Sequence, residues 1–257
     1  MARIFITGSS TGLGLMAGQL LIEQGHQVVL HGRNRTRAER AMADAPGAQA
    51  VVIGDLSQIS ETRSVADQVN RLGRFDAVIH NAGVGYREGR PVATQHGVPH
   101  VFATNVLAPY VLTALIERPD RLIYLSSGMH HGAEPNFDDL LWTKRRWQGA
   151  QAYAESKLHD VVLAFAVANR WPAVRANALE PGWVATRMGG AGATDDLSKG
   201  HLTQSWLAVS NEALARSSGE YFYHQALRGP NPIARDQTAQ HRLIEACARL
   251  TGVLLPN

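Results

Sequence analysis

The sequence has few of the features that mark secreted or membrane proteins. Its 257 residues include one cysteine, Cys247, so no intrachain disulfide can form and nothing requires an oxidising compartment. No run of about 18 apolar residues occurs. In "MARIFITGSS" a glycine turn follows the first short strand too soon to leave room for the apolar stretch of a signal peptide. We therefore expect a cytoplasmic protein with no membrane anchor.

An excess of one charge is also missing. The chain has 25 Lys plus Arg against 22 Asp plus Glu, a formal charge of +3, and these residues are scattered. The one local run, "KRRW" at 144–147, is typical of a solvated loop or helix end. Composition therefore predicts no nucleic-acid partner, whereas 45% hydrophobic residues suffice for the core of one domain.

Short β-rich runs alternate with helical segments along the chain. The runs are "RIFIT", "HQVVLH", "AQAVVIG", "FDAVIHN", "RLIYLSS", "VRANALEP" and "EYFYH". Such alternation indicates βαβ units, and nearly all-apolar strands indicate a sheet covered on both faces. We predict one α/β domain over residues 1–257, Rossmann-type and doubly wound, with a mostly parallel seven-stranded sheet and helices on both faces.

Two stretches interrupt this alternation with long glycine-containing segments. They contain "GMHHGAEPNFDD" and "MGGAGATDDLSKG". Long loops in a compact domain are commonly functional. We expect an active-site loop at about 128–150 and a substrate lid at about 185–210. The apolar side chains expected around the substrate are Trp183, Met188, Leu202, Trp206 and Leu207.

A glycine-rich turn, "TGSSTGLG", lies between the first strand and the first helix. Gly8, Gly12 and Gly14 allow a tight turn and a close backbone approach, and the helix start offers free N–H groups to a phosphate. The spacing is G-x-x-x-G-x-G, which differs from the commonest dinucleotide fingerprint. Its position between strand and helix nevertheless predicts a dinucleotide pyrophosphate site.

The end of the second strand indicates which dinucleotide binds. An acidic residue would accept hydrogen bonds from a ribose 2′-hydroxyl, but the sequence there is "HGRNR", with Arg33 and Arg35 and no carboxylate. A guanidinium complements a 2′-phosphate by charge and by its forked donors. NADP(H) is therefore favoured over NAD, the alternative being that Arg33 is a solvated turn residue.

Further motifs follow in order: "NAG" at 81–83, "YLSS" at 124–127, "YAESK" at 153–157 and "PGWVAT" at 181–186. Together with the glycine turn, they make the chain resemble the short-chain dehydrogenase/reductase family over essentially its whole length. The chain is most similar to the retinol dehydrogenase and protochlorophyllide reductase type, through "NVLAPYVLT" at 105–113 and "SSGMHHGAEPNFDDL". It lacks the N-terminal membrane anchor that many retinol dehydrogenases carry, so a membrane-dissolved retinoid is not the expected substrate.

The resemblance implies a catalytic tetrad of Asn105, Ser127, Tyr153 and Lys157. The family pattern selects the second of two adjacent serines, and Ser126 stays open as the alternative. In the family, the lysine also holds the nicotinamide ribose and the asparagine anchors a water of a proton relay. For Asn105 a structural role, such as bending a helix, remains an equal alternative.

The resemblance also implies the cofactor contacts. They are expected at Gly8, Ser10, Thr11, Gly12, Leu13, Gly14, Arg33, Asp55, Leu56, Asn81, Ala82, Gly83, Tyr153, Lys157, Pro181, Gly182, Val184 and Thr186. Asp55 and Leu56 match the adenine contact, and Thr186 matches the contact to the nicotinamide amide. An N-cap role for Asp55 and a strand-tying role for Asn81 remain alternatives.

The spacing of Tyr153 and Lys157, i and i+4, places them on one helix face. A free tyrosine has a pKa of about 10, and nearby positive charge favours the phenolate, so the lysine and an oxidised nicotinamide would bring the phenol toward general acid–base work at neutral pH. The predicted function is an NADP-dependent oxidoreductase that acts on a carbonyl or alcohol of a fairly apolar small molecule. The alternative is a non-catalytic NADP(H)-sensing protein on the same fold.

The sequence has two weaker indications, one about a metal site and one about assembly. His130 and His131 are adjacent but have no third ligand at a suitable spacing, so no metal site is predicted. Many relatives pair the "YAESK" helix and the helix around residues 98–117 across a two-fold axis. A homodimer is therefore a possible assembly, with a monomer as the alternative.

Overall fold

The computed structural model describes residues 1–94 and 97–257. Its centre is one sheet with the strand order β3-β2-β1-β4-β5-β6-β7-β8. Every neighbouring pair is parallel except β7 and β8, which are antiparallel. The strands are β1 (Arg3–Ile6), β2 (Gln27–Gly32), β3 (Ala50–Ile53), β4 (Ala77–His80), β5 (Arg121–Leu125), β6 (Arg175–Glu180), β7 (Tyr221–Tyr223) and β8 (Ala226–Leu227).

The predicted Rossmann-type fold is confirmed, and the strand count of seven needs one correction. All seven expected runs form strands, and the eighth strand, β8, has only two residues. It forms a hairpin with β7 through His224 and Gln225, which have φ of 48° and 62°. Positive φ at both central residues is the geometry of a type I′ turn. Because the usual Asn-Gly signal is missing, the sequence gives no indication of this hairpin.

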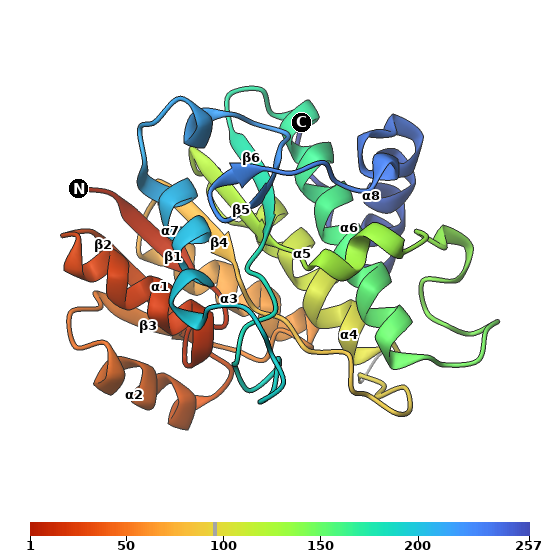
Figure 1. The fold of residues 1–257 in the computed structure, drawn as a ribbon, viewed down its shortest axis with the longest axis horizontal. Helices are drawn as coiled ribbons and strands as arrows, with labels where there is room; N and C mark the ends of the chain where they lie inside the picture. The colour runs from red at the N-terminus through yellow and green to blue at the C-terminus, as the bar shows by residue number, and fades with distance from the viewer. Residues whose placement is uncertain (95–96) are drawn as a thin grey trace.

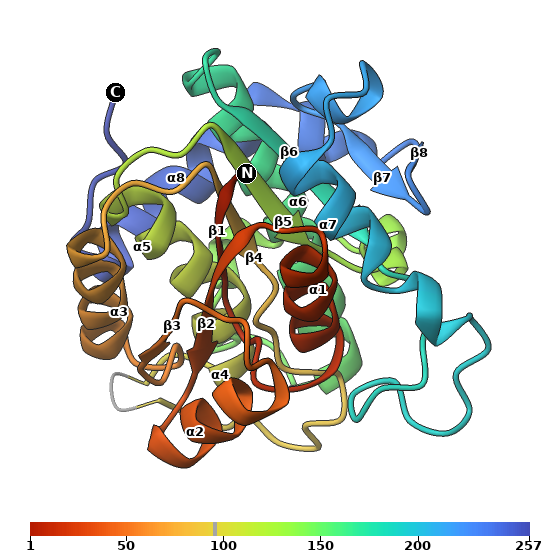
Figure 2. The ribbon, with the colours of Figure 1, turned by 90° about the vertical axis from the view of Figure 1, so that its left-hand side faces the viewer.

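Helices cover both faces of the sheet (Figures 1 and 2). They are α1 (Gly12–Glu23), α2 (Arg35–Asp44), α3 (Ile59–Arg71), α4 (His100–Phe102), α5 (Ala108–Leu115), α6 (Gly149–Arg170), α7 (Leu202–Val209) and α8 (Gln237–Thr251). One core layer joins α3, α5 and α6 to the sheet, with α8 packed against α6. The other core layer lies under α1, α2 and α7. Side chains alternate between the layers along the strands, as in β1, where Phe5 faces the first layer and Ile4 and Ile6 face the second.

The chain order of the strands reverses at β1, since β2 lies on one side of it and β4 on the other. In open α/β sheets a ligand crevice lies at the carboxyl ends of the strands beside such a reversal. The segments that leave β1, β4, β5 and β6 at that edge are the ones that carry the glycine turn, "NAG", "SS" and "PGWVAT". The fold therefore gathers the sequence motifs at one edge of the sheet.

Candidate functional site

The glycine turn is shaped by contacts that only glycine permits. Gly8 has a φ of 63°, and a Cβ built on it would lie 2.7 Å from the Cα atom of Ala82. Gly12 has a φ of 60° and begins α1, and Thr11, the N-cap residue, makes no side-chain bond to the first-turn amides. Free amides and the absence of acidic residues in that turn suit a phosphate group. The residues present thus fit a dinucleotide pyrophosphate.

Asn81 holds this turn from the neighbouring strand. Its Nδ2 atom donates to the carbonyls of Thr7, at 2.9 Å, and Gly8, at 3.2 Å. A Cβ on Gly14 would come within 2.4 Å of the same Nδ2 atom, so the helix start can approach only because residue 14 is glycine. Asn81 therefore has the strand-tying role weighed above. Of the other residues expected to contact the cofactor, Leu13 lies under Gly200, whose added Cβ would be 2.9 Å from its Cδ2 atom.

His31 is a contributor that the sequence analysis missed. Its ring is buried, its Nδ1 atom accepts the Gly8 N–H at 2.9 Å, and its Nε2 atom lies 2.9 Å from the carbonyl of Gly54. These bonds need the neutral ring with the proton on Nε2, and burial lowers the pKa of His31 to about 4. A histidine next to a glycine turn in space, but 23 residues away in the chain, leaves no recognisable pattern in sequence.

Arg33 and Asp55 lie at the carboxyl ends of β2 and β3. Arg33 is exposed and makes no hydrogen bond or ion pair with any residue the structure describes. The Asp55 Oδ1 atom accepts the Ser57 N–H at 2.9 Å, which caps the turn before α3, while the N-cap of α3 itself is Gln58. The side chain of Leu56 is in the core, so only its backbone can reach a cofactor.

The serine pair after β5 divides its roles by orientation. Ser126 is buried, and its hydroxyl donates to the carbonyl of Lys157 at 2.7 Å, which joins β5 to α6. Ser127 is half-buried, its Oγ atom accepts the Met129 N–H at 3.3 Å, and its hydroxyl acts to lower the pKa of Tyr153. The geometry therefore favours Ser127 as the serine that faces the reacting group.

Tyr153 and Lys157 lie on one face of α6, as their spacing predicts. The Lys157 Nζ atom is 5.9 Å from the centre of the Tyr153 ring. Burial raises the pKa of Tyr153, while Lys157 and Ser127 oppose the increase without cancelling it. In the chain alone, therefore, desolvation outweighs the lysine. An oxidised cofactor would add positive charge beside the phenol and so act in the same direction as Lys157.

Asn105 lies in a π-helical turn, Ala103–Leu107, directly before α5. Its side-chain Oδ1 atom accepts the Val84 N–H at 2.8 Å, and its Nδ2 atom donates to the carbonyl of Val84 and the hydroxyl of Ser156. These bonds show a structural role for the side chain. π-Helical turns are frequent at functional sites, and the expected anchoring of a water stays a prediction.

The segment after β6 lies over Tyr153. Gly182 has a φ of 86°, and the Thr186 Oγ1 atom accepts the Gly189 N–H at 3.2 Å. The turn places the Met188 sulfur 3.9 Å from the Tyr153 hydroxyl. The ring of Tyr86 packs edge-on against Tyr153 with 5.7 Å between centroids. Apolar side chains therefore stand directly in front of the phenol.

The carbonyl of Gly189 holds this segment in place. It accepts hydrogen bonds from the Trp183 indole at 3.1 Å and from Tyr86 and Arg87 at 3.4 Å. The expected lid, about 185–210, is a loop only in its first part, because the helix α7 begins at Leu202. Leu207 is buried in the core under α7, and Trp206 packs against Phe222, so these two do not face the substrate as expected. An apolar stripe on a short helix cannot by itself distinguish a lid from a core element.

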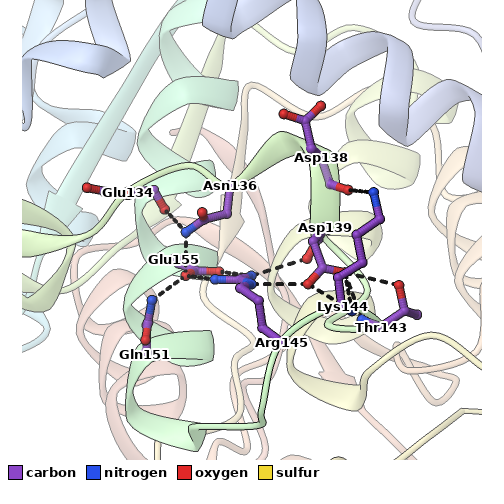
Figure 3. Close-up of polar contacts among 9 residues, drawn as sticks. All are labelled: Glu134, Asn136, Asp138, Asp139, Thr143, Lys144, Arg145, Gln151 and Glu155. Atoms are coloured by element: carbon purple, nitrogen blue, oxygen red, sulfur yellow. Dashed lines mark hydrogen bonds and ion pairs between the residues drawn. The ribbon is translucent and has the colours of Figure 1, made fainter.

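The segment 128–150 is tied to α6 by a polar cluster (Figure 3). Arg145 forms ion pairs with Glu155, at 2.7 Å, and Asp139, at 3.1 Å. Glu155 also accepts bonds from Asn136 and Gln151. The "KRRW" run is thus only partly a solvated face, since Arg145 is three-quarters buried and Arg146 is exposed.

Of the two adjacent histidines, His130 is engaged with the protein itself. The His130 Nδ1 atom lies 2.8 Å from the carbonyl of Ser127, and its Nε2 atom accepts the Asn231 N–H at 3.2 Å. Both ring nitrogens of His130 therefore have partners.

In the part of the chain that the structure describes, every helix is too short or too polar to serve as a membrane span.

Comparison with known proteins identifies the architecture and its motifs. The family model of the short chain dehydrogenases matches residues 2–121. The short-chain dehydrogenase chyC of Penicillium rubens is 40% identical, with 100% of both chains covered. Human retinol dehydrogenase 13 is 29% identical over 99% of this chain and 86% of its own.

A solved structure of an uncharacterized protein from Mycobacterium paratuberculosis superimposes with a TM-score of 0.86 at 25% identity. It covers 100% of this chain and 96% of its own. Sequence similarity over the full length and the shared fold agree with the motifs gathered at the sheet edge. The chain belongs to the short-chain dehydrogenase/reductase family, and within it to the retinol dehydrogenase-like type.

Proposed function

We propose that this oxidoreductase transfers a hydride between NADP(H) and a carbonyl or alcohol of a fairly apolar small molecule, with Tyr153 as general acid and base. The observation that carries the proposal is the convergence of Tyr153, Ser127 and Lys157 at the edge of the sheet that holds the glycine turn. Three polar groups brought together from β5 and α6 suit proton transfer to an oxygen atom.

The proposed reduction uses the chain's own groups in named roles. When bound, the nicotinamide supplies or takes up the hydride and, in its oxidised form, adds a positive charge to the site. Tyr153 donates its proton to the carbonyl oxygen, and Ser127 hydrogen-bonds the same oxygen. Two donors then meet the negative charge that develops there. Lys157 stabilises the phenolate that remains, because an opposite charge lowers its free energy.

Two features support the finer choices of cofactor and substrate. Arg33 lies at the end of β2, where a carboxylate would favour NAD, and its guanidinium has no partner among the described residues, which supports NADP(H). Met188 and Tyr86 beside the phenol support an apolar substrate.

The chain itself covers the surfaces of α5 and α6 that the expected homodimer would use. All residues from Ala152 to Val167 on α6 are buried within one chain. The C-terminal segment covers the ends of both helices, since Tyr110 donates to Val253 and Arg170 to Pro256. We therefore propose a monomer of 27.9 kDa, which analytical ultracentrifugation would contradict by finding twice that mass.

The central test replaces Tyr153 by phenylalanine. NADPH oxidation is followed with a panel of aldehydes and ketones, and Tyr153→Phe is expected to lower turnover at least about a hundredfold because the general acid is lost. Tyr110→Phe is the matched control, since it removes a buried hydroxyl that bonds to Val253 at 2.8 Å, away from the site.

Two other outcomes would count against the proposed function. Equal turnover of the wild-type protein and Tyr153→Phe would refute the role of the phenol. NADPH binding without turnover of any member of the panel would favour the sensing protein over the enzyme.

A further inference from the structure

Helix α6, which carries Tyr153 and Lys157, also carries a buried carboxylate, Asp160, that lies outside the motifs described above. The Asp160 Oδ2 atom accepts a hydrogen bond from the Lys157 Nζ atom at 2.8 Å. The side chains of the two residues are 4% and 5% exposed. The spacing i, i+3 places Asp160 one turn after the lysine on the same face of α6.

The lysine ammonium is held at two points. Besides Asp160, it donates to the carbonyl of Leu125 at the end of β5, at 2.7 Å. An ammonium has three N–H donors, so one is left for another acceptor. Gly83 lies beside it, since a Cβ on that glycine would be 3.5 Å from Nζ. The direction of the third donor therefore depends on the bonds to Asp160 and Leu125.

The pair of Lys157 and Asp160 also determines how strongly positive charge stabilises the Tyr153 phenolate. A buried ammonium without a partner would stabilise the phenolate strongly, whereas a carboxylate in contact with it turns the single charge into a dipole whose field falls off faster. Among the described residues, Asp160 is the carboxylate that forms an ion pair with Lys157, at 2.8 Å.

We propose that Asp160 is a positioning residue of the catalytic centre. It holds the Lys157 ammonium in place, and its negative charge weakens the effect of the lysine charge on Tyr153. This inference rests on the proposed role of Tyr153 as acid and base. Removal of the carboxylate charge, with the hydrogen bond kept, is then expected to move the titration of Tyr153 to lower pH.

The other groups that face this pair remain neutral in the working range. From β5, Tyr124 is buried and bonds to Thr113, and burial raises its pKa far above the usual value. From β4, His80 stacks on Tyr124, and burial lowers the pKa of His80 to about 3. Tyr86 and Ser127, from the segments after β4 and β5, contribute hydroxyl groups. Burial raises the pKa of Asp160 to about 6, against the opposing charge of Lys157, so both charges of the pair are present above that pH.

The test titrates Tyr153 directly and needs no turnover. Tyrosine labelled with ¹³C at Cζ is incorporated into the wild-type chain and into Asp160→Asn, which keeps an acceptor of nearly the same size. The Tyr153 signal is assigned by its loss in Tyr153→Phe. We expect the midpoint to fall by about one pH unit in Asp160→Asn, which is a tenfold rise in the ratio of phenolate to phenol at a given pH.

The matched control is Glu155→Gln. Glu155 is a buried carboxylate on the same helix, but its charge is paired with Arg145 and not with Lys157. It should leave the midpoint of Tyr153 unchanged, although it weakens the fold. Thermal melts of each variant establish that it is folded over the pH range used.

A Tyr153 signal with the same midpoint in wild type and Asp160→Asn overturns the proposal. A shift in both Asp160→Asn and Glu155→Gln would overturn it too, because a general loosening of α6 would then explain both. The proposed function fails separately, through unchanged turnover in Tyr153→Phe. Where turnover is measured, the pH profile of kcat/KM for alcohol oxidation should move with the NMR midpoint.

Discussion

At the scale of single residues, Arg33 and Arg35 illustrate how neighbouring side chains of one type acquire different roles. Arg35 lies in the first turn of α2 and forms an exposed ion pair with Glu39 at 2.9 Å. Arg33 precedes the helix and has no such partner among the described residues. Exposed i, i+4 pairs contribute little to stability, so neither side chain is needed for the fold.

Arg33→Ala is expected to raise the dissociation constant for NADPH about tenfold or more and to leave that for NADH nearly unchanged. The reason is the loss of a charge-assisted hydrogen bond to a phosphate that only NADPH carries. Arg35→Ala is the control, and fluorescence titration with both nucleotides measures the ratio. Equal weakening for the two nucleotides would remove Arg33 from the 2′-phosphate site.

At the scale of elements, the segment 128–150 combines loose backbone with firm attachment. Before α6 begins at Gly149, its helical turns are two short 3-10 turns, Gly128–Gly132 and Phe137–Asp139. Its anchor is Arg145, which joins Asp139 of the loop to Glu155 of α6 (Figure 3). Since Glu155 lies between Tyr153 and Lys157 in sequence, the helix presents one face to the reaction and another to the loop.

Arg145→Ala should lower the free energy of unfolding by roughly 2 kcal/mol, because it leaves the buried carboxylate of Glu155 without its charged partner. Urea unfolding monitored by circular dichroism measures the change. The neighbouring Arg146 is exposed, and Arg146→Ala should stay within about 0.5 kcal/mol of the wild-type protein. Similar losses for both arginines would mean that the cluster does not anchor the loop.

At the scale of the whole molecule, four histidines among the described residues are buried as neutral rings. His31, His80, His130 and His159 are each at most 5% exposed. Burial lowers the pKa of His80 to about 3 and those of His31, His130 and His159 to about 4. The unfolded chain titrates these groups near pH 6.5.

The sign of the resulting pH dependence follows from linkage. Between about pH 6.5 and pH 4 the unfolded state binds more protons than the folded state, so the free energy of unfolding falls as the pH falls. Each group contributes on the order of 3 kcal/mol by pH 4. Asp160, with a pKa raised to about 6, acts in the opposite direction between that value and 3.8 and offsets part of the loss.

We therefore expect a steep decrease in urea midpoint between pH 6.5 and pH 4.5. His241 is an exposed histidine with an i, i+4 contact to Glu245, and His241→Gln should leave the slope as it is. A midpoint that is constant over this range would show that the four rings are not buried neutral in the folded protein.

Much of the fold could be predicted because the pattern that carries it is local. Apolar strand runs, helix periodicity and glycine turns each act within a few residues, and all seven predicted strands are present. The exception is β8, whose His224-Gln225 turn reaches positive φ without a glycine or asparagine. Its geometry depends on pairing with β7 and is not encoded by a local propensity.

The candidate site divides in the same way between local and long-range information. The sequence by itself determined the glycine turn, the i, i+4 pair of Tyr153 and Lys157, and a site at the strand ends, because spacing along one element defines them. Only the tertiary structure distinguished Ser127 from Ser126, brought His31 to the amide of Gly8, and set Met188 before the phenol. These contacts join segments 23 to 35 residues apart. Such distances are closed by core packing, which no local pattern records.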